Sequence, residues 1–250
     1  MRIAAIVSGF FCFFFSISAM AVTVSGKVEV TPQLLEKLAA ADNVDPNAAN
    51  RPYYWNVPNG ILPVIPPRID LSSDIAIIVS KDDKEANASD PLRTVKVYAG
   101  SMETDVIITR PGSTIRFRNV DPFDHELYSP QLQGFQPERQ SNGSFRPMEF
   151  QQEGVFEIRC KLIPHFKSYL VVTKALRAAQ ANKDGTFALE NMTPGKYTVK
   201  VFYDGAWIYE EPFVIGGQQR EAKLEIKLKP GGADADKAKG KEGEKAAKAE

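Results

Sequence analysis

Apolar and polar residues alternate with a period of two over much of the chain. The pattern is clearest at residues 22–30, 113–119 and 221–228. Because successive side chains of a strand point to opposite faces, this alternation predicts half-buried β-strands. Other short apolar or alternating runs predict further strands at 74–80, 93–98, 105–109, 154–160, 169–173, 186–189, 196–202, 206–210 and 212–215. Short strands separated by Gly and Pro turns favour an all-β fold of the sandwich type.

Helical spacing is confined to residues 32–41, where Leu34, Leu35 and Leu38 fall on one side. The stretch that follows, residues 44–68, is rich in Asn and Pro and carries Tyr53, Tyr54 and Trp55. We interpret it as a long ordered loop, because so many aromatic side chains are unusual in a flexible linker. The three aromatics could bind a partner or a sugar, or pack over the edge of a sandwich.

The pattern divides the chain into five segments. Residues 1–21 form a leader, and residues 22–92 hold N-terminal strands and the long loop, expected to pack on the sandwiches. Residues 93–173 form a first sandwich and residues 174–229 a smaller, all-β second one. Residues 230–250 are almost entirely Lys, Glu, Ala, Gly and Asp. This tail has too few apolar side chains to offset the entropy of ordering, so we expect it to be disordered.

The leader predicts the compartment. A positive start at Arg2 precedes an apolar run, residues 3–20, which closes on Ala19-Met20-Ala21. This is the pattern of a signal peptide cleaved after Ala21. The alternative is an uncleaved anchor, since a run of about 18 apolar residues can just span a bilayer. We expect a periplasmic or secreted protein without a transmembrane span once the leader is removed.

The overall charge is balanced, with 31 basic and 31 acidic residues. No net field draws nucleic acid or an anionic membrane toward the protein, so we expect neither as a partner. The expected partner is an unidentified redox or binding protein of the envelope. We find no Ser-His-Asp set, phosphate-cradling glycine loop or paired-acid motif, and with two histidines the usual acid–base catalysis has few groups available. We therefore expect a protein that is not an enzyme.

The candidate chemistry lies in the two histidines and the one cysteine outside the leader. His125 follows strand 113–119, Cys160 ends strand 154–160, and His165 comes five residues later, after a proline. One thiolate and two imidazoles form the trigonal set of blue-copper electron-transfer sites. The predicted metal ligands are therefore His125, Cys160 and His165, with copper as the cofactor. The alternative for Cys160 is burial as a small apolar residue.

Several other polar residues are weaker candidates. Asn119 precedes His125, and we expect it to hydrogen-bond the loop around Cys160. We expect two further aspartates beside His125 to cap a turn, and a carboxylate cluster in residues 81–90 to hold a hard cation or simply to be solvated. These acidic residues are Asp121 and Asp124, and Asp82, Asp83 and Glu85.

The residues around this set carry a family resemblance. Residues 111–121, His125, residues 154–160 and residues 170–172 together resemble a cupredoxin of the plastocyanin and amicyanin type. Residues 184–199 resemble the carboxypeptidase regulatory-like domain, and the whole of 93–228 resembles exported methylamine-utilisation-like proteins. The resemblance implies a cupredoxin Greek-key β-sandwich followed by a smaller prealbumin-like sandwich. It also implies one copper, used for electron transfer or copper handling in the cell envelope.

The loop after the cysteine departs from this family. There the loop usually reads Cys-x-x-His-Pro-aromatic-Met, which puts Ile163 at the second histidine, His165 at the aromatic residue and Phe166 at the methionine. Azurin-like and rusticyanin-like members instead place the histidine five residues after the cysteine, as Cys160 and His165 are, with Tyr169 or Leu170 near the axial position. Two hypotheses follow: a copper protein, or a metal-free scaffold that binds protein or carbohydrate or has a structural role.

Overall fold

The computed structural model describes residues 21–36, 69–81, 89–175, 177–217 and 219–229. The apolar run of the leader, the aromatic loop with Tyr53, Tyr54 and Trp55, the acidic group of Asp82, Asp83 and Glu85, and the tail 230–250 lie outside the described residues. Residues 32–36 are helical, and the rest of the helix expected there also lies outside them. Among the helices described, none is long and apolar enough to cross a membrane.

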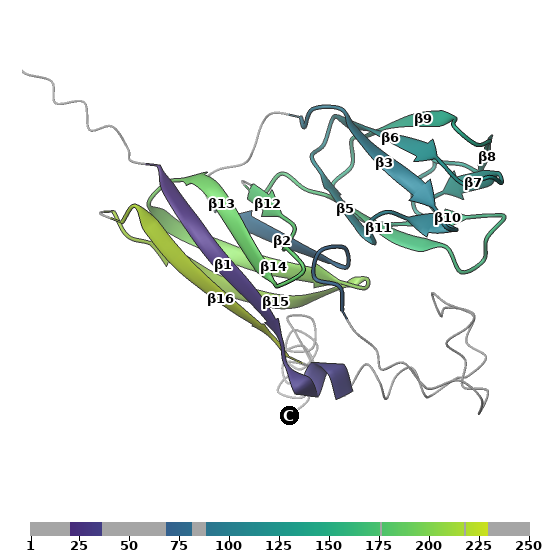
Figure 1. Cartoon of the computed structure of the whole chain (residues 1–250). Coiled ribbons are helices and arrows are strands. Elements are labelled where there is room, and N and C mark those ends of the chain that lie inside the picture. The colour runs from purple at the N-terminus through teal and green to yellow at the C-terminus, as the bar shows by residue number, and fades with distance from the viewer. Residues whose placement is uncertain (1–20, 37–68, 82–88, 176, 218, 230–250) are drawn as a thin grey trace, which may run out of the picture.

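The described residues are almost entirely β-structure, which confirms the predicted fold class. Sixteen strands form four sheets (Figure 1). Their bounds are β1 Val22–Val30, β2 Ile75–Ser80, β3 Arg93–Tyr98, β4 Ser101–Met102, β5 Val106–Thr109, β6 Ser113–Asn119, β7 His125–Tyr128, β8 Glu138–Gln140, β9 Phe145–Phe150, β10 Gly154–Cys160, β11 Lys167–Val172, β12 Arg177–Ala179, β13 Thr186–Met192, β14 Gly195–Tyr203, β15 Ala206–Ile215 and β16 Glu221–Leu228.

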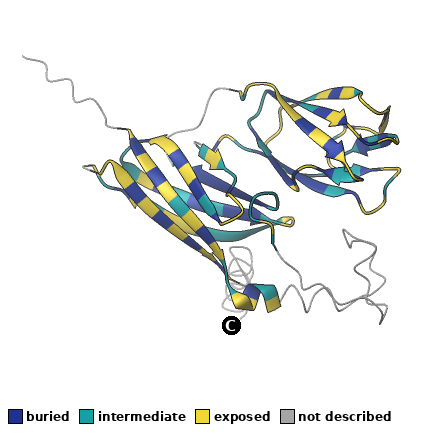
Figure 2. Ribbon diagram, in the orientation of Figure 1, coloured by how far each residue is buried: buried dark blue, intermediate teal, exposed yellow. Residues whose placement is uncertain are grey.

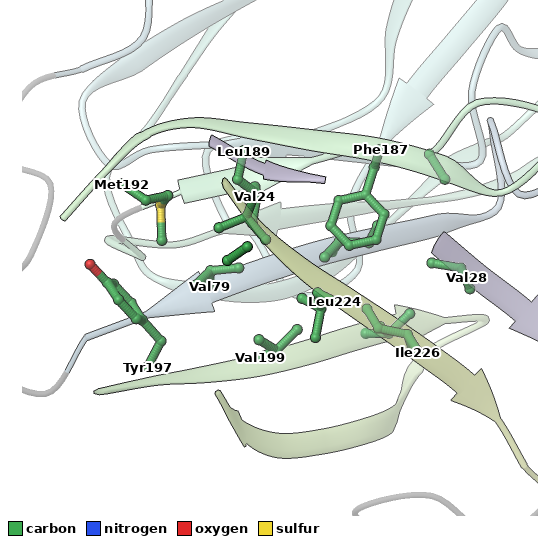
Figure 3. Packing of buried hydrophobic residues seen from close by; sticks show 14 of the residues in the cluster. Val24, Val28, Val79, Phe187, Leu189, Met192, Tyr197, Val199, Leu224 and Ile226 are labelled. Carbon is green, nitrogen blue, oxygen red and sulfur yellow. The ribbon is translucent and has the colours of Figure 1, made fainter. Parts of the chain in front are cut away.

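Two of these sheets form a sandwich assembled from distant parts of the chain, which we call the split sandwich. Its sheets have the strand orders β13-β1-β16 and β12-β2-β14-β15. Apolar side chains from both sheets, among them Val24, Val79, Phe187 and Ile226, form its core (Figure 3). The first strand, β1, runs antiparallel to β13 and parallel to β16, so it is central to its sheet.

The split sandwich differs from the predicted segmentation. Residues 22–92 were expected to pack on the sandwiches, and residues 174–229 to form the second sandwich by themselves. Instead β1 and β2 are hydrogen-bonded within the two sheets of that sandwich. The physical reason is that β2 is buried over residues 75–79, so its backbone groups have no access to water and need strand partners along both edges. It has them in β12 and β14.

The segment between β2 and β12 forms the other sandwich, which we call the inserted sandwich. Its sheets have the orders β5-β11-β10-β7-β8 and β4-β3-β6-β9. Phe117, Phe135, Ile158 and Leu170 are fully buried between them. The sequence did not predict four strands of this sandwich. Strands β4, β7 and β8 are only two to four residues long, and β9 contains Pro147, which is tolerated there because β9 is an edge strand.

The two sandwiches meet over a small apolar junction. Ala76, Ile78 and Phe202 of the split sandwich lie in one cluster with buried residues of the inserted sandwich, including Tyr169 and Val171. The rings of Tyr169 and Phe202 are 5.3 Å apart between centroids. At one side the amide of Val106 donates to the carbonyl of Ser73 at 3.1 Å, which ties the loop before β5 to the loop before β2.

Candidate functional site

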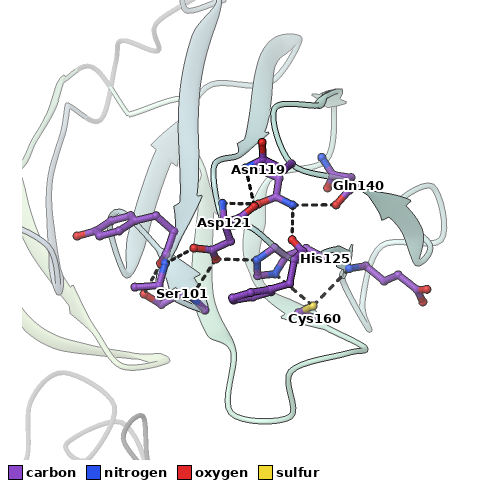
Figure 4. Close-up of polar contacts among 12 residues, drawn as sticks. Ser101, Asn119, Asp121, His125, Gln140 and Cys160 are labelled. Carbon is purple, nitrogen blue, oxygen red and sulfur yellow. Dashed lines mark hydrogen bonds and ion pairs between the residues drawn. The ribbon is translucent and has the colours of Figure 1, made fainter.

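Two neighbouring strands of the inserted sandwich bring His125 and Cys160 together. Strand β7 begins at His125, β10 ends at Cys160, and the two strands pair antiparallel with Cys160 opposite Leu127. The His125 Nδ1 atom lies 3.6 Å from the Cys160 Sγ atom. His125 is 0% exposed and Cys160 4% exposed, so the pair is buried in the sandwich (Figure 4).

A buried carboxylate fixes the orientation of the imidazole. Asp121 Oδ2 is 2.8 Å from His125 Nε2, so Nε2 carries a proton and Nδ1 faces the sulfur. The same carboxylate accepts the amides of Ala99 and Gly100, at 2.5 and 3.0 Å. Both of these residues have positive φ, 52° and 73°, and successive amides in such a turn converge on an anion. Asp121 thus connects the β3–β4 turn to the imidazole.

The two aspartates beside His125 therefore have different roles. Asp121 accepts hydrogen bonds from backbone amides, as a capping residue would, but these amides belong to the β3–β4 turn and not to its own loop. Asp124 lies at the surface and accepts from Arg139 Nε at 2.6 Å. This pairing holds the pKa of the Asp124 carboxyl below its usual range.

Asn119 does not contact the loop after Cys160, contrary to the prediction. Its side-chain amide donates to the carbonyls of Phe123 and Gln140, at 2.8 and 2.9 Å, and its Oδ1 accepts the amide of Asp121 at 2.9 Å. Asn119 is fully buried, and buried polar atoms take partners from the nearest backbone. The side chain closes the β6–β7 loop and so holds Asp121 and His125 in position (Figure 4).

The sulfur lies among hydrogen-bond donors. The amide of Glu126 donates to Sγ at 3.4 Å, and the amides of Leu162 and Ile163 also point to it. Burial by itself would raise the pKa of Cys160, but the hydrogen bonds from His125 and these amides outweigh it and lower the pKa below its usual value. Burial would likewise lower the pKa of His125, while its hydrogen bonds to Cys160 and Asp121 raise it. The hydrogen bonds of the pair thus favour the charged form of each of the two side chains, against the effect of burial.

His165 is not assembled with this pair. Its side chain is exposed, in the loop between β10 and β11. Its Nε2 atom lies close to Gly100 of the β3–β4 turn, 3.9 Å from where a Cβ on that glycine would be. Within the described part of the chain, no group of three or more His, Cys, Asp or Glu side chains is arranged to hold a metal ion. Of the three predicted ligands, the structure brings His125 and Cys160 together, and metal binding by His125, Cys160 and His165 stays a prediction.

Apolar side chains take the space next to the pair. Phe166 is 1% exposed, with its ring centroid 5.9 Å from that of His125, and Ile163 packs against the same core while half-buried. A trigonal copper site needs a third donor beside the thiolate and the first imidazole. Neither Ile163 nor Phe166 provides one, so the residues present do not fit a blue-copper centre.

The two residues considered for the axial position also lie elsewhere. Tyr169 faces the junction with the split sandwich, and its hydroxyl donates to Asp204 Oδ1 at 3.3 Å. Leu170 is on the opposite face of β11, fully buried in the core of the inserted sandwich. Neither side chain completes a metal site.

The chain was compared with protein families, curated sequences and solved structures. No protein-family model and no curated protein sequence matches the chain. Among solved structures, the chain is similar to a purple cupredoxin from Nitrosopumilus maritimus, with 19% identity over 32% of this chain and 99% of that one, at a TM-score of 0.30. It is similar to amicyanin from Paracoccus versutus, with 16% identity over 40% and 98%, at a TM-score of 0.30.

A copper-containing nitrite reductase from Thermus scotoductus is also similar, with 22% identity, at a TM-score of 0.31. That match covers 34% of this chain and 23% of the reductase. The names of the first and third of these structures mention a cupredoxin and copper, and the three matches cover 32%, 40% and 34% of the chain.

Proposed function

We propose that the protein is an exported scaffold of the cupredoxin type that carries no copper and acts as a binding or structural module of the cell envelope. The observation that carries this proposal is the packing of Ile163 and Phe166 beside the His125–Cys160 pair, with His165 exposed outside it. The signal-peptide pattern of residues 1–21 supports export. The lack of an acid–base constellation in the sequence supports a role other than catalysis.

The polar groups around Cys160 support a structural role for the pair. The imidazole, the Asp121 carboxylate and the amides of Ala99, Gly100 and Glu126 all have partners within the protein. Together they connect β7, β10 and the β3–β4 turn. A buried network of this kind stabilises one arrangement of a fold when every member has a partner.

Copper binding is the second candidate, with electron transfer to an envelope partner or copper handling as its use. The specific observation in its favour is that Nδ1 of His125, an unprotonated ring nitrogen when His125 is neutral, faces Cys160 Sγ at 3.6 Å. The lowered pKa of the thiol also favours a soft metal ion. This candidate lacks a third donor, for which His165 would have to move inward.

The two candidates are separated by rebuilding the missing donors. The double variant Ile163→His/Phe166→Met supplies an imidazole and a thioether where the aliphatic and aromatic side chains now pack. After addition of Cu(II), we expect the wild type to remain without a thiolate-to-copper charge-transfer band and the double variant to gain one. The same band in the wild type would overturn the metal-free proposal. The single variant His165→Asn is the control, and its spectrum should match that of the wild type.

A further inference from the structure

The outer face of one sheet of the inserted sandwich carries an unusual group of cations. In the sheet β4-β3-β6-β9, Val95, Val97 and Phe117 belong to the core, so the residues between them point outward. Figure 2 shows buried and exposed positions alternating along β3. On this outer side Lys96 of β3 and Arg118 of β6 are exposed, and Arg116 is half-buried. Tyr98 and Phe145 add two exposed rings, at 50% and 49% exposure. We call these five residues the basic face.

The cations of the basic face have no acidic partners within the described residues. The guanidinium carbons of Arg116 and Arg118 both lie over the ring of Phe145, 5.4 and 5.3 Å from its centroid. Lys96 forms no ion pair there, although it stands directly opposite Arg118 in the pairing of β3 with β6. Other cations of the chain do pair: Lys167, for example, is 2.7 Å from Asp204.

This arrangement opposes the stability of the sheet. Like charges directly opposite each other on neighbouring strands are destabilising. Two guanidinium groups over one ring also repel each other. The nearest acidic residues by register, Glu103 and Glu149, flank the face, and Glu149 accepts a hydrogen bond from Gln151 instead of pairing with a cation. Sites where a sequence departs from such local rules are often functional. At this site a bound anion would reduce the repulsion between the cations.

We propose that the basic face binds an acidic polysaccharide, one whose sugar units carry carboxylate or sulfate groups. This inference rests on the proposed binding function and names its ligand class. The guanidinium groups of Arg116 and Arg118 suit planar carboxylate or sulfate groups, to which arginine donates in pairs. The exposed ring of Tyr98 offers a flat apolar surface on which a sugar ring can stack, while the ring of Phe145 holds the two guanidinium groups beside each other.

The position of the face favours a polysaccharide over an acidic peptide. Extended peptides usually add to the free edge of a sheet, where backbone groups are unpaired. Strand β6, which carries both arginines, is paired on both sides, with β3 and with β9, so at Arg116 and Arg118 the face offers side chains only. The balanced net charge of the whole chain does not reveal this face, because its cations are clustered on one sheet.

The test uses the full mature chain and polymers of defined chemistry. Binding is measured to dextran sulfate, to uncharged dextran and to poly-L-glutamate, at low and at high salt. The variant Arg116→Gln/Arg118→Gln removes two charges from the face, and Phe145→Ala removes the ring. The matched control, Lys223→Gln/Lys227→Gln, removes two exposed charges from β16 of the split sandwich.

We expect dextran sulfate to bind at least about tenfold more tightly than dextran, and less tightly as salt rises, because salt screens exposed charges. The arginine double variant should lose about tenfold in affinity, Phe145→Ala a few-fold, and the β16 control less than twofold. Equal loss in the β16 control, or no preference for dextran sulfate over dextran, would overturn the proposal. Tighter binding of poly-L-glutamate would overturn it in favour of an acidic protein partner. Copper uptake does not enter any of these readouts, so failure here is separate from failure of the metal-free proposal.

Discussion

Two regions of the inserted sandwich differ in whether their charged and polar groups have partners within the protein. One is the end of the sandwich around Cys160, and the other is the outer face of the β4-β3-β6-β9 sheet. At Cys160 the thiol, imidazole and carboxylate are buried, and each is hydrogen-bonded to the others or to backbone amides. On the basic face three cations are turned outward, and none of them pairs with an acidic side chain of the described chain. The first arrangement stabilises the fold, whereas the second opposes it.

This contrast suggests where to look for function in the protein. A polar group with all its partners inside the protein has its interactions satisfied and contributes to one stable structure. A group of like charges without partners lowers stability and gains most from a ligand of opposite charge. The residues that first suggested a metal site are thus satisfied by the protein itself, while a surface without a recognisable motif is the better candidate for binding.

The largest expected effect comes from removing the aromatic ring beside the pair. Phe166→Ala should lower the free energy of unfolding by about 3–5 kcal/mol, because it leaves a cavity next to His125. Denaturant unfolding followed by fluorescence or circular dichroism measures this loss. Phe123→Ala is the control, since Phe123 also lies near His125 but is 46% exposed, and its loss should stay near or below about 1 kcal/mol. Similar losses in both variants would show that Phe166 does not fill the site.

The second prediction concerns the carboxylate that holds the imidazole. Asp121→Asn should lower the free energy of unfolding by about 2–3 kcal/mol, because an amide cannot accept from Ala99, Gly100 and His125 together. The surface variant Asp124→Asn removes a charge three residues away, and its effect should stay within about 1 kcal/mol. Urea unfolding of both variants at one pH gives the comparison. If Asp124→Asn were the more harmful, the network would not have the structural role given to it here.

The fold was largely predictable from the sequence because period-two alternation is a local signal. Strands β1, β3, β6, β10 and β16 begin and end where the alternation does. The pairing of β1 and β2 with the C-terminal strands was not predictable, because it depends on contacts between residues about 120 to 200 positions apart.

The candidate site was predictable only in part. Strand ends placed His125 and Cys160 close together, since both residues border strands with clear patterns. In the loop between β10 and β11, the side chain that turns inward is the one whose burial is most favourable. The apolar ring of Phe166 gains more from burial than the imidazole of His165, and the short loop cannot bury both. The basic face left no local motif, because its residues come from three strands and meet only in the sheet.

A third prediction concerns the junction, where acidic groups from both sandwiches meet. Burial and then the neighbouring Asp74 raise the pKa of Asp105 to about 7, and the pKa of Asp74 is also raised, mainly by burial. A carboxyl whose pKa is raised on folding contributes stability that is complete below its unfolded value, near 3.8, and is lost as the pH rises through about 7. Asp105→Asn, which resembles the protonated form, should remove this loss.

The measurement is the free energy of unfolding at pH 5 and pH 8 for the wild type and for Asp105→Asn. The wild type should lose more stability than the variant between these two values. Asp204→Asn is a useful comparison, because Asp204 contributes less to the shift of Asp105 than Asp74 does and also pairs with Lys167. An unchanged pH dependence in Asp105→Asn would contradict the raised pKa of Asp105.

The smallest predicted effect is an increase in stability on removal of a charged side chain. Lys96→Gln should raise the free energy of unfolding by up to about 0.5 kcal/mol at low salt, because it removes the like-charge pair with Arg118. The gain should vanish at high salt, where exposed charges are screened. Lys223→Gln, on β16, should leave stability unchanged. A clear loss of stability in Lys96→Gln would mean that Lys96 has a stabilising partner and that the basic face is not strained.

The central claim is that His125 and Cys160 form a closed, structural pair and not a copper centre. The most direct test is equilibrium dialysis of the full mature chain against Cu(I) and against Cu(II), with the bound metal counted in the wild type and in Cys160→Ala. We expect no difference in bound copper between the two proteins. One equivalent of copper bound by the wild type and lost in Cys160→Ala would contradict it.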